Sequence, residues 1–141
     1  KEIVAMEVST DDVHDVKAFK GLLEGAEERR RVSGLLGDGA YDSGDVFEEL
    51  EERGIEAVVK PRRNSVLGPG SSARGRAVRE FQELGYEVWA WEKAYGRRWA
   101  VETAFSTFKR LFGEHCLARS MDCITRELVA KVSLYNMLVN M

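Results

Sequence analysis

Several residue types that mark common kinds of functional site are scarce in this chain of 141 residues. Its two cysteines, Cys116 and Cys123, are too few for a disulfide framework and form no C-x-x-C pair, so we interpret both as free thiols. Its two histidines, His14 and His115, lie far apart without metal-ligand spacing, which argues against a histidine metal site. No apolar run approaches the roughly 18 residues that span a membrane. We therefore expect no membrane partner. The free thiols and the absence of a secretory signal predict a cytoplasmic protein.

The start of the chain lacks an initiator methionine and is not a signal peptide. It has neither the long apolar stretch nor the cleavage site of such a peptide. Residues 2–8 alternate in the manner of a β-strand instead. We therefore expect residues 1–141 to be a fragment, one partial domain of a larger protein.

Positive charge is lacking in one half of the chain and abundant in the other. The net charge of −3 alone argues against binding to nucleic acid. Residues 1–57, however, carry 7 Lys/Arg and 16 Asp/Glu, a net of −9, whereas residues 58–141 carry 14 and 8, a net of +6. An acidic half can gather metal ions and a basic half can follow phosphates. Two simply solvated surfaces are the alternative interpretation.

Hydrophobic periodicity predicts an α/β domain. Short apolar or alternating runs predict strands at residues 2–8, 32–37 and 55–59 and an extended segment at 86–91. Helical spacing predicts helices at residues 13–23, 44–53, 74–84, 92–112 and 123–140. Ser43 is a good N-cap for the second of these helices, and Gly54 is a good stop.

One acidic residue, Asp38, follows directly after a predicted strand. Acidic groups at the carboxyl ends of strands in an α/β sheet point into the ligand crevice. Gly37 and Gly39 on either side leave the backbone free to bend and let a ligand approach. The alternative is that Asp38 serves only as a turn residue.

The long predicted helix carries four polar residues at suggestive spacings. Tyr95, Arg98, Glu102 and Lys109 are separated by two, three and six residues. At about 100° per residue they fall within a sector of roughly 60°. An adjacent apolar arc is predicted to face the core: Ala100, Val101, Ala104, Phe105, Phe108, Leu111 and Phe112. The alternative for Glu102 is a surface pair with Arg98, which contributes only about 0.2–0.5 kcal/mol.

Convergent carboxylates flanked by cations fit a particular chemistry. Mg²⁺ takes hard oxygen ligands and keeps several waters. Two such ions about 3.5–4 Å apart can activate an attacking hydroxyl and stabilise a leaving oxygen. Nucleotidyl transfer on DNA needs such acids, with cations beside them for the phosphate backbone. It needs no nucleophilic Ser or Cys.

These motifs resemble those of a known family. Gly37-Asp38-Gly39-Ala40-Tyr41-Asp42, followed by the Tyr-(2)-Arg-(3)-Glu-(6)-Lys spacing of residues 95–109, closely resembles the catalytic domain of DDE-class transposases of prokaryotic insertion sequences. The tail, from Phe105-Ser106 through Glu127 to Tyr135-Asn136, is also similar, and so in outline is the start. The resemblance covers nearly the whole chain.

The resemblance implies a ribonuclease H-like fold, a mixed sheet flanked by helices. It implies three acids that bind two divalent cations, Mg²⁺ or Mn²⁺, and that act in cleavage and strand transfer at transposon ends. Asp38 would be the second acid and Glu102 the third. Arg98 and Lys109 would contact DNA and Tyr95 would support that region. The implied partners are terminal inverted repeats and target DNA, and a homo-oligomer stays open. A cytoplasmic protein with these partners would be associated with the nucleoid when it binds DNA.

The chain departs from the family at the first acid. That residue lies on a strand immediately before the one predicted at residues 2–8, and nothing in this chain fills its place. We therefore expect the domain to be truncated at its N-terminus, its two-ion site to be incomplete and the fragment to be inactive alone. The alternatives are a non-catalytic DNA-binding remnant, an interfering partner of full-length copies, or an unrelated interaction domain. Basic side chains beside the site are candidate phosphate contacts or a solvated loop: Arg62, Arg63, Arg74, Arg76 and Arg79.

Overall fold

The computed structural model describes residues 2–9, 15–67 and 72–141 and contains five α-helices and two strands in these ranges. In chain order they are α1 (Asp15–Glu27), β1 (Gly34–Gly37), α2 (Gly44–Glu52), β2 (Glu56–Val59), α3 (Ala73–Glu92), α4 (Trp99–Phe112) and α5 (Met121–Val139). Two short 3₁₀ turns, η1 (Gly39–Tyr41) and η2 (Tyr95–Arg98), follow β1 and precede α4. The chain is thus helix-rich with a small parallel sheet, so the α/β prediction is confirmed only in part, and the described strands do not form the expected mixed sheet.

The sheet of the described residues has two parallel strands, with Leu35 beside Ala57 and Leu36 beside Val58. Because side chains alternate along a strand, the two pairs face opposite sides of the sheet. Leu35 and Ala57 pack with residues of α1 and α2, including Phe19. Leu36 and Val58 pack on the other side. The sheet therefore separates two small cores.

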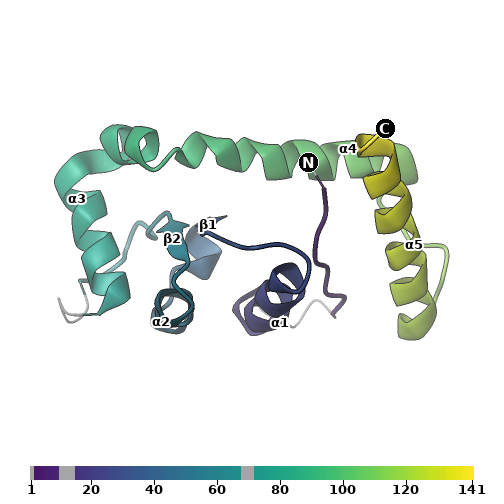
Figure 1. The fold of residues 1–141 in the computed structure, drawn as a ribbon, viewed down its shortest axis with the longest axis horizontal. Helices are drawn as coiled ribbons and strands as arrows, with labels where there is room; N and C mark the ends of the chain where they lie inside the picture. Colours follow the sequence, from purple (N-terminus) through teal and green to yellow (C-terminus); the bar gives the residue numbers. More distant parts are fainter. Residues whose placement is uncertain (1, 10–14, 68–71) are drawn as a thin grey trace.

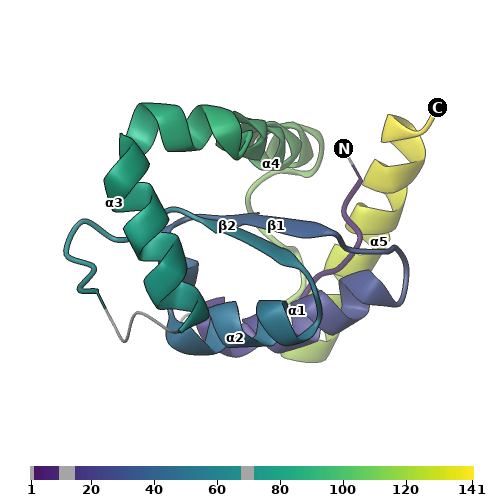
Figure 2. The ribbon, with the colours of Figure 1, turned by 60° about the vertical axis from the view of Figure 1, so that its left-hand side comes forward.

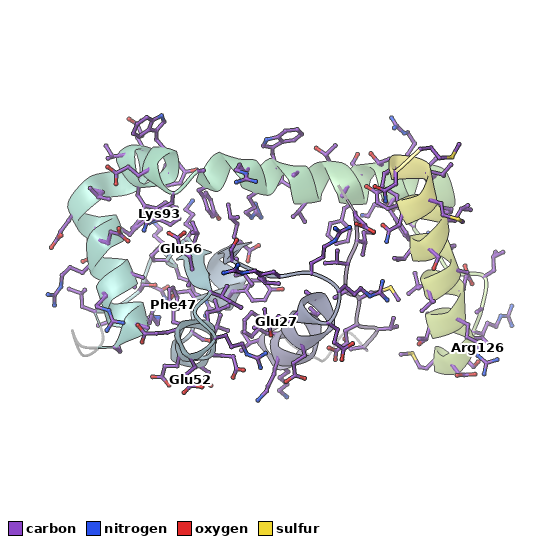
Figure 3. The ribbon with its side chains drawn as sticks, viewed as in Figure 1. Glu27, Phe47, Glu52, Glu56, Lys93 and Arg126 are labelled. Carbon is purple, nitrogen blue, oxygen red and sulfur yellow. The ribbon has the colours of Figure 1, made fainter. Side chains whose placement is uncertain are left out.

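Helices α1 and α2 lie in a layer on one side of this sheet, α3 and α4 lie in a second layer on the other, and α5 stands at one end (Figures 1 and 2). The core on one side joins α1 and α2, and the core on the other joins α3 and η2 through Trp89 and Tyr95. An ion pair ties the second layer to the sheet, because Lys93 Nζ lies 3.4 Å from Glu56 Oε1 of β2 (Figure 3). The fold thereby brings η2 and the start of α4 beside the end of β1.

The predicted ends of α2 are confirmed. The Ser43 side chain accepts a hydrogen bond from the Val46 N–H, which caps the first turn. Gly54 ends the helix with a φ of 66°, a left-handed conformation that glycine adopts without steric cost. The predicted strands at 32–37 and 55–59 are also present, slightly shortened, and the predicted turn at residues 10–12 lies outside the described residues.

The prediction of a strand at residues 2–8 is wrong. The segment has no strand partner among the described residues, and instead Asn136 of α5 holds the backbone of Ile3. The Asn136 amide accepts from the Ile3 N–H at 2.9 Å and donates to its carbonyl at 2.7 Å. A strand exists only in a ladder with another strand, so an alternating sequence alone could not form one here.

The predictions for residues 86–112 also need correction. Residues 86–92 are helical, because α3 resumes after a break at Gly85 with φ 73° and ψ 163° (Figure 1). This turn buries Trp89 against Phe81 and Tyr95, and the strands of the described ranges do not pair with it. The single predicted helix 92–112 is interrupted at Ala94, which has φ 50° and ψ 33°, before η2 and α4.

The apolar arc of α4, predicted to face the core, is only partly covered. None of the residues of α4 is buried, and Val101 and Phe105 are 51% and 59% exposed. Two adjoining hollows of about 600 Å³ each lie against this face and share Leu22, Val101 and Phe105. We call them together the α4 groove. The core-face prediction is therefore correct only in part: Phe108 packs on the buried Tyr135 of α5, whereas Val101 and Phe105 stay exposed.

The groove also borders a free strand edge. The carbonyls of Ser33 and Gly37 accept hydrogen bonds from the β2 side, from Glu56 N and Lys60 N. Backbone groups of alternate residues in a parallel ladder point to opposite edges. The N–H and C=O of Gly34 and Leu36 therefore point away from β2, where the described chain provides no strand.

In the described part of the chain, no helix combines the length and hydropathy needed to span a membrane. Both cysteines are free thiols in the structure, as predicted.

Candidate functional site

Asp38 lies directly after β1, as the sequence predicts, and begins the η1 turn. Its Oδ1 accepts a hydrogen bond from the Ala40 N–H at 2.9 Å, so Asp38 is the N-cap of that turn. Half of its side-chain surface, 50%, stays exposed to solvent. Asp38 is therefore a turn residue, as the alternative interpretation states. Its second oxygen, Oδ2, faces another partner.

That second partner is Arg98, which joins Asp38 to Glu102. Arg98 Nη2 lies 3.4 Å from Asp38 Oδ2, and Nη1 donates to Glu102 Oε1 at 2.8 Å. The fold thus gathers around one guanidinium two acids that lie far apart in the sequence. The surface-pair interpretation of Glu102 is also correct in part, since Arg98 and Glu102 are four residues apart on the helix start.

Tyr95 holds the η2 turn against the strand. Its side chain is only 7% exposed, and its hydroxyl donates to the Gly37 carbonyl at 3.1 Å. Burial raises the pKa of the Tyr95 hydroxyl, and the nearby Arg98 charge opposes that rise. This hydrogen bond places η2, and with it Arg98, directly beside Asp38. Ala94 supports the same placement with a left-handed backbone, which costs a non-glycine residue roughly 1 kcal/mol.

The fourth residue of the predicted stripe lies away from this cluster. Lys109 is two helical turns beyond Glu102, and its Nζ pairs with Glu114 at 3.4 Å near the end of α4. Its side chain is exposed. Arg63 lies on an exposed turn after β2. Both are exposed cations and are not members of the acidic cluster.

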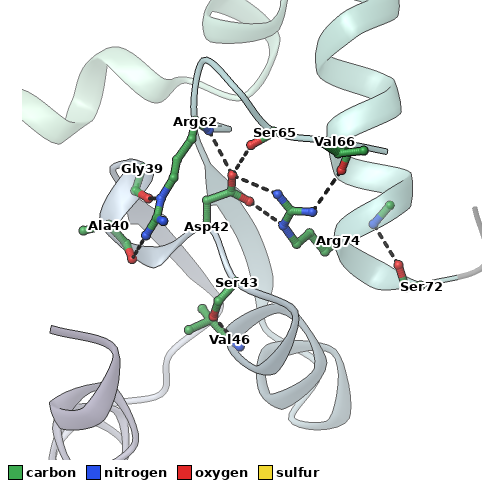
Figure 4. A network of polar contacts seen from close by, with 11 residues as sticks. Gly39, Ala40, Asp42, Ser43, Val46, Arg62, Ser65, Val66, Ser72 and Arg74 are labelled. Atoms are coloured by element: carbon green, nitrogen blue, oxygen red, sulfur yellow. Dashed lines mark hydrogen bonds and ion pairs between the residues drawn. The ribbon is translucent and has the colours of Figure 1, made fainter. Parts of the chain in front are cut away.

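Asp42 is the centre of a second polar network, to which the sequence analysis assigned no role (Figure 4). Its side chain is fully buried, and Arg74 at the start of α3 donates to both oxygens at 2.7 and 3.1 Å. The Arg62 N–H donates to Oδ2 at 2.9 Å, and the Ser65 hydroxyl also bonds that oxygen. The loop after β2 and the start of α3 are thereby fastened to the end of η1.

The pKa of Asp42 reflects these contacts. Burial raises it, but the hydrogen bonds from Arg74, the Arg62 N–H and Ser65 outweigh burial, and the pKa lies below the ordinary value of 3.8. Asp42 is therefore a charged anchor at neutral pH. The sequence offered one signal, a second acid four residues after Asp38, but nothing in its spacing pointed to Arg74.

Arg62 adds a second connection between the loop after β2 and the η1 turn. Its guanidinium donates to the carbonyls of Gly39 and Ala40 at 2.6 and 3.3 Å. A Cβ added at Gly39 would meet the Arg62 side chain at 3.3 Å, so the space left by this glycine is filled from within the chain. Arg62 and Arg74, both candidate phosphate contacts, thus make internal contacts that position the turn bearing Asp38.

The donors at the site suit a hard cation. Asp38, Arg98 and Glu102 line the part of the α4 groove beside β1. Exposed carboxylate oxygens, with room for water, are the ligands of a Mg²⁺ or Mn²⁺ ion that keeps several waters. Within residues 2–9, 15–67 and 72–141, however, no group of three acidic, histidine or cysteine side chains could hold a metal. Asp38 and Glu102 could therefore supply some, but not all, of the ligands of such an ion.

Comparison with known proteins places the chain in a family. Residues 1–137 match the family model described as transposase DDE domain, and the chain belongs to that family. Transposases of this family carry out DNA transposition by nuclease and strand-transfer chemistry, so the match supports a role in transposition. No solved structure matches the chain.

Proposed function

We propose that the chain is the C-terminal part of a ribonuclease H-like transposase domain that cuts and joins DNA at the ends of an insertion sequence. The observation that carries the proposal is the convergence of Asp38 and Glu102 on one guanidinium, that of Arg98. These acids come from the end of a strand and the first turn of a helix. The match to the transposase DDE domain supports the interpretation of this arrangement as part of a catalytic site.

Asp38 and Glu102 would hold the divalent cation, Mg²⁺ or Mn²⁺, which supplies Lewis-acid activation of the attacking oxygen and stabilisation of the leaving one. Arg98 and Lys109 would neutralise phosphates of the bound strand, since both lie on the exposed side of α4 or its start. Arg63 would extend this contact along the loop after β2. Tyr95 and the Arg62 guanidinium would act by positioning, because each binds the backbone beside Asp38.

We further propose that the domain is partial as given. Two features of the structure support this proposal: the uncovered apolar face of α4 and the free edge of β1. Both border the same groove, where an additional strand would find apolar side chains and unpaired backbone groups. A strand placed there, carrying the missing acid, would lie beside Asp38 and Glu102 and complete the site.

The small number of acids at the site favours a second candidate function for the chain alone. A site with two acids among the described residues can attract a cation and DNA without supporting cleavage. The chain would then be a non-catalytic DNA-binding remnant, or a partner that interferes with full-length copies by entering mixed assemblies.

The test is DNA nicking by the chain extended at its N-terminus with the residues encoded directly upstream. The substrate is DNA carrying the ends of the insertion sequence, with Mg²⁺ or Mn²⁺. The extended protein should nick this DNA only with metal, and Glu102→Gln should abolish nicking while leaving the circular dichroism spectrum unchanged. Glu92→Gln, which neutralises an exposed glutamate at the end of α3, is the matched control and should nick normally.

Retained nicking by Glu102→Gln would refute its proposed metal role. A folded, extended protein that binds DNA but never nicks it would favour the remnant.

A further inference from the structure

One guanidinium satisfies both acids of the candidate site. Arg98 is the cation paired with Asp38 and with Glu102 in the described part of the chain. Each acid uses a different nitrogen of Arg98, so a single side chain spans the space between the two carboxylates. One oxygen of each carboxylate is therefore engaged by a protein cation.

A metal ion would be a second cation at this cluster, beside the guanidinium of Arg98, and the charges there do not favour both in the same place. Two carboxylates and one guanidinium give a formal charge of −1, which attracts a divalent ion less strongly than the two acids alone would. A metal bound to Asp38 Oδ2 and Glu102 Oε1 would lie within a few ångströms of the guanidinium, where like charges repel.

The contacts of Arg98 are nevertheless easy to exchange. The side chains of Arg98, Asp38 and Glu102 are 31%, 50% and 66% exposed, and ion pairs in such positions are weak. The backbone of Arg98, by contrast, is fixed at the end of η2, which Tyr95 holds against β1. The guanidinium can therefore move away while its point of attachment stays beside the site.

We infer that Arg98 is a stand-in cation: it holds the acidic pair together before metal binds, and it leaves Asp38 and Glu102 when a divalent cation takes their oxygens. Its guanidinium then becomes available to a DNA phosphate. This inference rests on the proposed metal role of the two acids. It adds that metal and DNA bind with positive cooperativity through Arg98, and binding linkage makes this coupling reciprocal.

The first experiment measures Mn²⁺ affinity of the 141-residue chain by calorimetry. Arg98→Gln should bind Mn²⁺ roughly 30-fold more tightly than the unchanged chain, as expected when a unit charge about 4 Å from a divalent ion is removed in a water-like dielectric. Arg97→Gln removes the same charge from an exposed neighbour in η2 and should change the affinity less. Arg98→Lys keeps the charge, and its affinity should stay below that of Arg98→Gln. Glu102→Gln should weaken binding strongly.

The outcomes separate this inference from the proposed function. Equal or weaker Mn²⁺ binding by a folded Arg98→Gln protein, with binding still lost in Glu102→Gln, would overturn the stand-in role and leave the metal site intact. Unchanged binding by both Asp38→Asn and Glu102→Gln would place the ion elsewhere and overturn both. Circular dichroism establishes that each variant is folded.

The second experiment measures the coupling. Affinity for a fluorescent 30-base-pair duplex is compared with and without saturating Mn²⁺ at constant ionic strength. Mn²⁺ should strengthen DNA binding by the unchanged chain more than it strengthens DNA binding by Arg98→Gln. The Arg97→Gln variant should respond to Mn²⁺ as the unchanged chain does. The same Mn²⁺ effect in the unchanged chain and Arg98→Gln would overturn the transfer of Arg98 to DNA.

Discussion

Two acidic residues at opposite ends of the η1 turn have contrasting surroundings. Asp42 is fully buried and receives hydrogen bonds from Arg62, Ser65 and Arg74, so all of its partners are internal. Asp38 is half exposed, and beyond its capping bond its partner is Arg98 at 3.4 Å. The difference shows how the chain separates support from function: one acid fixes the turn, and the other is left able to exchange its partner.

This contrast predicts different consequences for stability. A buried, fully bonded charge resists removal because its partners are left without compensation. An exposed pair in water contributes little.

The largest effect is expected from Asp42→Ala. It should lower the free energy of unfolding by about 3–5 kcal/mol, because the Arg74 and Arg62 donors lose a buried anion. The measurement is urea denaturation followed by circular dichroism. Asp38→Ala is the matched control and should cost less than about 1 kcal/mol. Equal losses in the two variants would contradict the comparison.

Acid should weaken the Asp42 network next. Because the folded-state pKa of Asp42 lies below 3.8, its contribution is present above that value and is lost as the pH falls through the lower folded pKa. The stability difference between the unchanged chain and Asp42→Asn should therefore shrink as the pH falls below about 3.8. Urea midpoints at pH 5, 4 and 3 measure it. A difference that does not vary with pH would count against the charged anchor.

Tyr95→Phe tests the link that places Arg98 beside Asp38. Losing the buried hydrogen bond to the Gly37 carbonyl should cost about 1 kcal/mol. Thermal unfolding measures this loss. Tyr86→Phe, which alters a half-exposed hydroxyl on α3, should leave stability unchanged. If the two variants unfolded alike, the Tyr95 hydroxyl would have no role in holding η2.

The smallest effect is expected from Arg98→Gln, which should change the free energy of unfolding by no more than about 0.5 kcal/mol. Both of its ion pairs are exposed, so water replaces them at little cost. The same urea titration measures the change. A loss above 1 kcal/mol would mean that the acidic cluster supports the fold, and the contrast with Asp42 would disappear.

Local signals in the sequence were sufficient for part of this architecture. The strand before Asp38, the Ser43 cap and the Gly54 stop all depend on neighbouring residues, and all are present. The four-residue spacing of Arg98 and Glu102 likewise predicted their contact. Asp38 meets the same guanidinium because η2 packs on β1. The family resemblance, and not the spacing of residues, indicated that Asp38 and Glu102 belong to one site.

The remaining features depend on long-range partners. Residues 2–8 alternate as a strand does, but their backbone contact is with Asn136, at the other end of the chain. Asp42 meets Arg74 across the loop after β2. Residues 86–91 are helical because Trp89 finds a core against Tyr95. Periodicity describes one segment at a time and cannot identify such partners.

The uncovered face of α4 has a consequence for the life of the protein in a cell. Exposed apolar side chains such as Val101 and Phe105, next to an unpaired strand edge, are the features by which polypeptides associate with one another. They are also what chaperones and proteases encounter on incompletely assembled chains. The abundance of this polypeptide in a cell should therefore depend on how quickly that face becomes covered.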